Sequence, residues 1–118
     1  MLTFVITALI AAQPLRLAVL GDRTGGADSA SWQATIRAVE LMRPDLVVSV
    51  GDLIEGYCDS AEAIGQWTGV LEGIRPLRRF GLVATPGNHD IWSPASEEVW
   101  ATQTGWPVEG VVRRPGVD

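Results

Sequence analysis

Apolar residues along this chain alternate between short continuous runs and longer segments with helical spacing. Three short runs, residues 15–20, 46–50 and 80–84, are rich in Leu and Val, and each precedes a turn that contains glycine. Short apolar runs bounded by turn residues are typical of buried strands. Between and after them, apolar residues recur every three or four positions, which is typical of helices that face a core. The pattern predicts strand and helix in alternation, three times over.

Capping residues mark where the first and third helices should begin and end. Either Ser29 or Ser31 can cap the first helix, which is expected to run to about Arg43. The third helix is expected to begin at Ser93, which proline follows, and to stop at Gly105. The residues of the first helix expected to face the core are Trp32, Ile36 and Val39.

The second helix has a clear start and an unusual glycine content. Asp59 with Glu62 has the spacing of a capping box, with Asp in the capping place. Gly65, Gly69 and Gly73 weaken this helix, and we expect them to allow close packing on the sheet. Its expected core-facing residues are Ile64, Trp67, Leu71 and Ile74.

The order of elements predicts an α/β fold, βαβαβα, with a largely parallel sheet. Parallel neighbours joined through helices have right-handed crossovers, and ligands bind beyond the carboxyl ends of their strands. Three acidic turns, residues 21–26, 51–53 and 87–90, follow the three predicted strands directly. We therefore expect the three turns to meet at one edge of the sheet.

The chemistry of these turns points to a metal ion. Asp22 and Asp52 offer hard carboxylate oxygens, which Mg, Mn, Fe and Zn sites use. A Gly-Asp pair is weak evidence for a metal site, because Asp after Gly is common in turns. The third turn is more informative, because it joins Asn88, the lone His89 and Asp90.

The three turns, in this order, resemble the motifs of the calcineurin-like metallophosphoesterases, which include the purple acid phosphatases. The resemblance covers about residues 15 to 105 and implies the front half of that family's α/β sandwich. It implies two metal ions, Mn, Fe or Zn, with Asp22 and Asn88 each binding one ion and Asp52 bridging both. It further implies hydrolysis of a phosphoester substrate, with His89 acting on the phosphoryl group or leaving oxygen and Asp90 orienting His89.

The chain also departs from the family pattern. Thr24 replaces a metal-binding His or a Gly, and it either bonds a metal-bound water or caps the turn. Glu55 stands where purple acid phosphatases have a Tyr ligand, with Tyr57 two residues later. Glu55 is a supporting acid, a replacement ligand or an exposed loop acid. Because His89 is the only histidine, the family's three later His ligands have no counterpart.

Two functional hypotheses follow. In the first, residues 13–118 are a partial, apparently truncated phosphoesterase domain, which binds Mn or Zn weakly and turns over phosphoesters slowly or not at all. In the second, the chain is an inactive fragment or an interaction half-domain that self-associates through an unpaired sheet edge. The strand predicted to begin at Val108 supports truncation, because too few residues follow its turn to pair with it.

The net charge and the first twelve residues limit the binding partners and the cellular locations that the sequence favours. A net charge of −5 with no basic stripe disfavours nucleic-acid binding, while bound metals would still allow a phosphate substrate. The single cysteine excludes an internal disulfide. Residues 1–12 are almost wholly apolar, shorter than the roughly 20 residues of a membrane span. They fit a signal peptide, which predicts a secreted or periplasmic protein; as an ordinary strand they predict a cytoplasmic one.

Overall fold

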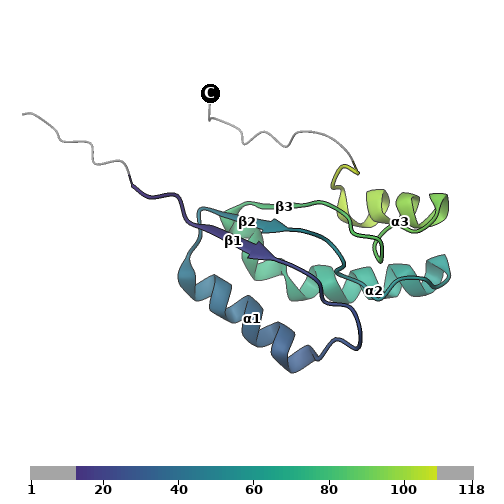
Figure 1. Cartoon of the computed structure of the whole chain (residues 1–118), viewed down its shortest axis with the longest axis horizontal. Coiled ribbons are helices and arrows are strands. Elements are labelled where there is room, and N and C mark those ends of the chain that lie inside the picture. Colours follow the sequence, from purple (N-terminus) through teal and green to yellow (C-terminus); the bar gives the residue numbers. More distant parts are fainter. Residues whose placement is uncertain (1–12, 109–118) are drawn as a thin grey trace, which may run out of the picture.

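The computed structural model describes residues 13–108 as an α/β unit (Figure 1). Its elements are β1 (Leu17–Leu20), α1 (Ser29–Met42), β2 (Leu46–Ser49), α2 (Ser60–Gly73), the 3-10 helix η1 (Arg75–Phe80), β3 (Leu82–Ala84) and α3 (Pro94–Thr104). The strands are parallel, in the order β1-β2-β3, so the predicted fold class is confirmed. The predicted third strand was too long, because its first residue belongs to η1.

Two predictions lie outside the described residues. These are the signal peptide over residues 1–12 and all but the first residue of the predicted strand over residues 108–112. Within residues 13–108, no helix is both long enough and apolar enough to cross a membrane.

The two faces of the sheet are covered unequally. Each strand is added on the same side of the previous one, so right-handed crossovers place α1 and α2 on one face (Figure 1). Ala18 and Leu20 of β1 are buried on that face. Leu17 and Val19, which point the other way, are 50% and 64% exposed. The helices therefore bury one side of β1 and leave the other open.

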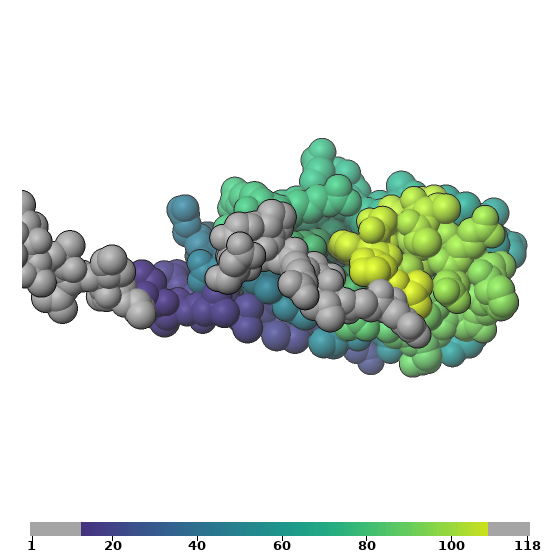
Figure 2. Space-filling model, turned by 90° about the horizontal axis from the view of Figure 1, so that it is seen from above, coloured from purple at the N-terminus to yellow at the C-terminus, as the bar shows by residue number. Residues whose placement is uncertain are grey.

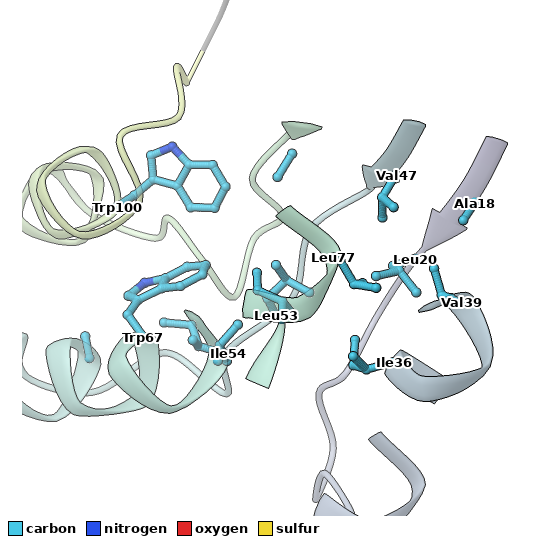
Figure 3. Close-up of a cluster of buried hydrophobic side chains, with 14 of the residues drawn as sticks. Ala18, Leu20, Ile36, Val39, Val47, Leu53, Ile54, Trp67, Leu77 and Trp100 are labelled. Carbon is cyan, nitrogen blue, oxygen red and sulfur yellow. The ribbon is translucent and has the colours of Figure 1, made fainter. Parts of the chain in front are cut away.

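The core lies between the sheet and the helices (Figure 3). Near β1, Ile36 of α1 and Leu77 of η1 lie close to Leu20. Trp67 of α2 and Trp100 of α3 are fully buried and meet edge to face, with ring centroids 5.2 Å apart. This tryptophan pair joins α3 to α2. The space-filling view shows α3, in yellow-green, at one end of the molecule (Figure 2).

The helix caps largely follow the sequence. Asp59 and Ser93 cap α2 and α3, and Gly105 ends α3 in the left-handed conformation, as predicted. The cap of α1 is Asp28, whose side chain accepts hydrogen bonds from two backbone N–H groups, including that of Ser31. The predicted serine caps were therefore wrong, because both serines lie inside the helix.

The buried side of α2 is rotated from the predicted one. Ile64 is 39% exposed, whereas Ala63 and Val70 are buried. A Cβ atom added at Gly65 or Gly69 would meet no other part of residues 13–108 within 4 Å. Close packing of these two glycines on the sheet was therefore a wrong prediction; they face open space.

Candidate active site

The three acidic turns meet at one edge of the sheet. The strands end in register, at Leu20, Ser49 and Ala84. The backbone N–H of Arg23 in the first turn donates to the Asp52 carbonyl at 2.8 Å. The backbone N–H of His89 in the third turn donates to Asp52 Oδ1, also at 2.8 Å. Asp52 therefore lies between the other two turns and is bonded to both.

Asp22, in the first turn, is exposed and held by its neighbour. Its Oδ1 atom accepts from the Thr24 hydroxyl at 2.6 Å and from the Thr24 N–H at 2.9 Å. These bonds, the hydroxyl's first, hold the pKa of Asp22 below its ordinary value. The carboxylate is therefore charged at neutral pH, and Thr24 caps this turn.

Two glycines allow the second and third turns to touch. A Cβ atom on Gly51, whose φ is +94°, would collide with the backbone nitrogen of Gly87. A Cβ atom on Gly87 would collide with the Asp52 carboxylate. Asp52 itself has a φ of +55°, a left-handed conformation that Asp adopts more readily than most residues. The glycines before Asp52 and Asn88 are thus required by packing between the turns.

Asp90 is buried and bonds the backbone. Its Oδ2 accepts from the N–H groups of Asp52 at 2.7 Å and Gly87 at 2.8 Å. Its Oδ1 accepts from those of Leu53 at 2.9 Å and Ile54 at 3.3 Å. Burial raises the pKa of Asp90, and these four donors oppose that rise by stabilising the charged form. The carboxylate ties the second turn to the third.

His89 is oriented by a backbone carbonyl. Its Nδ1 lies 2.6 Å from the carbonyl oxygen of Glu55, which can only accept, so Nδ1 carries a proton. The Tyr57 ring packs edge to face on the imidazole, with centroids 5.0 Å apart. Across residues 13–108, no hydrogen bond joins the ring to Asp90, the residue expected to orient it. The ring is held at Nδ1, which leaves Nε2 for chemistry.

Glu55 also holds the first turn through its side chain. Its Oε2 accepts from the Gly25 N–H at 3.0 Å, and its Oε1 accepts from Gly26 at 3.0 Å and Ala27 at 3.2 Å. These backbone donors hold the pKa of Glu55 below its ordinary value. Of the three roles that the sequence left open, the contacts favour support of the site.

Asn88 is positioned by a residue whose role sequence reasoning missed. Its Nδ2 donates to the Tyr57 hydroxyl at 3.1 Å, which turns the amide oxygen away from that contact. Tyr57 has a φ of +50° and also packs against Trp92, with centroids 5.5 Å apart. The only signal for Tyr57 in the sequence was its position shortly after Asp52.

The donor atoms suit a divalent cation in their chemistry. Asp22 Oδ2, Asp52 Oδ2 and Asn88 Oδ1 are hard oxygens, one on each turn, and none is hydrogen-bonded to another residue of 13–108. However, that part of the chain gathers no group of three His, Cys, Asp or Glu side chains that could hold a metal. The ligand types therefore fit a metal, while the ligand number is low.

The family to which this chain belongs is shown by its match to a protein-family model. The family model described as calcineurin-like phosphoesterase matches residues 15–115. The chain belongs to the calcineurin-like phosphoesterase family. A search of curated proteins and a search of solved structures each found no match. Membership implies a phosphoester substrate, and the family typically binds divalent metals.

Proposed function

We propose that this member of the family hydrolyses phosphoesters with two metal ions, Mn, Fe or Zn. In this proposal Asp22 and Asn88 would each hold one ion, and Asp52 would be the ligand common to both. The observation that carries the proposal is the meeting of the three turns, each with one oxygen that residues 13–108 leave without a hydrogen bond. Such ions, when bound, supply charge stabilisation of the phosphoryl group and activation of water.

With both ring nitrogens protonated, His89 would donate the proton on Nε2 to the departing oxygen and keep the one on Nδ1. The Glu55 carbonyl holds the proton at Nδ1, so Nε2 is the atom that exchanges a proton with the substrate. The edge of Tyr57 limits rotation of the ring. Asp90 acts as a positioning residue, because it fixes the two turns that carry Asp52 and His89.

Three ligands for two ions imply weak metal binding and slow turnover. The test is Mn²⁺ binding by electron paramagnetic resonance, together with hydrolysis of p-nitrophenyl phosphate. Asp52→Asn is expected to abolish Mn²⁺-dependent turnover and to weaken Mn²⁺ binding by about tenfold or more. Glu98→Gln, which alters an exposed acid on α3, is the control and should match wild type.

Two results would count against hydrolysis by this site. Equal turnover in wild type and Asp52→Asn would place the activity elsewhere. No turnover by the wild type at saturating Mn²⁺ would favour the non-catalytic alternative.

The second candidate function is self-association through the unpaired edge of β1. It is favoured by the outer position of β1 in the sheet of residues 13–108. The exposed side chains of Leu17 and Val19 on the same strand add apolar surface for a partner. Unpaired edge strands invite pairing with another chain. Light scattering after size-exclusion chromatography should show a dimer that Val19→Lys converts to a monomer. A wild-type monomer at all concentrations would reject this function.

A further inference from the structure

A hollow of about 490 Å³ lies beside the candidate active site. Its volume falls in the range of roughly 300–1,000 Å³ typical of small-molecule pockets. The hollow shares Glu55 with the site, since the carbonyl of the same residue holds His89. Its walls include Arg23 and Gly26 from the first turn, Glu55 from the segment after the second turn, and Gly65, Gln66 and Gly69 from α2.

Glycine keeps the α2 wall of this hollow open. A Cβ atom at Gly65 or Gly69 would meet nothing within 4 Å, so neither glycine serves close packing. Each costs a helix up to about 1 kcal/mol relative to alanine. A Cβ atom at Gly26, which also lines the hollow, would likewise meet no other atom of residues 13–108 within 4 Å. Gly65 and Gly69 thus leave the α2 side of the hollow open without a packing contact that requires glycine.

Arg23 lines this hollow, and no carboxylate within residues 13–108 forms an ion pair with it. One of its terminal nitrogens donates to the Leu53 carbonyl at 3.1 Å, and its guanidinium lies 5.4 Å from the centroid of the Trp32 ring. Its Nε is buried and makes no hydrogen bond to any residue of 13–108. The ion pairs found in residues 13–108 do not include Arg23. Both oxygens of Glu55, the acid in the same hollow, are occupied by backbone N–H groups.

We propose that the hollow binds the organic part of the phosphoester and that Arg23 pairs there with an anionic group on it. This inference rests on the proposed function, because it places the phosphoryl group at the three turns. The substrate then carries a second anionic group, such as a carboxylate or phosphate, on its alcohol part. Gly65 and Gly69 set the size of that part.

The first test measures binding alone, without metal. Nuclear magnetic resonance titrations compare 4-hydroxybenzoate with phenol. Wild type should bind 4-hydroxybenzoate at least about tenfold more tightly, as a charge-assisted pair implies, with shifts at the amides of Gln66 and Gly69. Arg23→Gln should lose this preference, and Arg23→Lys, which keeps the charge, should retain most of it. Gly69→Leu should block both probes.

Matched controls accompany these variants. Arg79→Gln removes an exposed arginine elsewhere, and Thr68→Leu adds bulk on the exposed side of α2; both should bind as wild type. Wild-type binding by Arg23→Gln, or shifts confined to residues outside the hollow, would overturn the proposal.

The second test measures selectivity in the Mn²⁺-loaded protein. The ratio of kcat/KM for 4-carboxyphenyl phosphate over phenyl phosphate should fall about tenfold in Arg23→Gln. The two tests separate the proposals. Arg23-dependent binding without any turnover would reject only the proposed hydrolysis. Asp52-dependent turnover without Arg23-dependent binding or selectivity would reject only the hollow as a subsite.

Discussion

The first acidic turn and the other two are held in different ways. The second and third turns are joined by the buried Asp90, which accepts four backbone hydrogen bonds. They also pack closely against each other at Gly51 and Gly87. The first turn is largely exposed, and the carboxylate of Glu55, itself exposed, holds it through hydrogen bonds from the backbone. One part of the candidate site is therefore built into the core, and the other is attached to it. Substitutions that disturb the second and third turns should therefore lower the stability of the whole fold. Substitutions that release the first turn should affect only that turn.

The largest expected effect comes from Asp90→Ala. Four backbone N–H groups would lose their shared acceptor, so the free energy of unfolding should fall by about 3–5 kcal/mol. Urea denaturation followed by circular dichroism measures the loss. The exposed Glu98→Ala should leave stability nearly unchanged. A similar small effect of Asp90→Ala would remove the distinction between the two parts.

Gly87→Ala should have the next largest effect. The added Cβ would collide with the Asp52 carboxylate, and overpacking of this kind typically costs about 1–3 kcal/mol. Thermal unfolding should show a lower midpoint. Gly65→Ala is the matched control: its Cβ meets open space in a helix, so the midpoint should rise by the equivalent of up to about 1 kcal/mol. A drop in both variants would point to a general effect of losing glycine.

Glu55→Gln should alter the first turn alone. The glutamine keeps one acceptor oxygen but loses the charge that strengthens three bonds to the backbone. Amide hydrogen exchange should become faster at Gly25 and Gly26 and stay unchanged at Leu53, which Asp90 holds. Equal acceleration at Leu53 would show that the turns open together.

Acid should release the first turn through the same carboxylate. The pKa of Glu55 in the fold lies below its ordinary value of 4.5, so its stabilising contribution is complete above pH 4.5. The contribution is lost as the pH falls from 4.5 through the lower pKa of the folded state. The amide shifts of Gly25 and Gly26 should follow this transition, which Glu55→Gln should lack and Glu98→Gln should keep.

Much of the fold followed from local patterns. The alternation of apolar runs and helical spacing predicted three parallel strands, because helical crossovers leave few other arrangements. Asp59 and Ser93 were predicted as caps, because a cap depends on residues only a few positions away. The rotation of α2 was missed, since the side that a helix buries depends on what packs against it. Ile64 and Ala63 are adjacent in sequence, and only packing chooses between them.

The candidate site also has some features that the sequence predicted and others that it did not. The order of motifs predicted that Asp22, Asp52 and Asn88 would share one edge, and the strand register places their turns there. The bonds of Asp90 were not predictable, because its partners at Asp52, Leu53 and Ile54 lie 36 to 38 residues earlier in the chain. Motif spacing identifies which residues gather, whereas hydrogen-bond partners depend on how the gathered backbones approach one another.

The sequence by itself determined the strand–helix order, the family, and which carboxylate and amide side chains follow the strands, because these depend on composition, spacing and chain direction. Only the tertiary structure decided that Asp90 accepts hydrogen bonds from backbone N–H groups, that the Glu55 carbonyl orients His89, and that Arg23 lines an open hollow. Those features depend on distances between atoms from distant segments. Such distances are fixed only when the segments pack together.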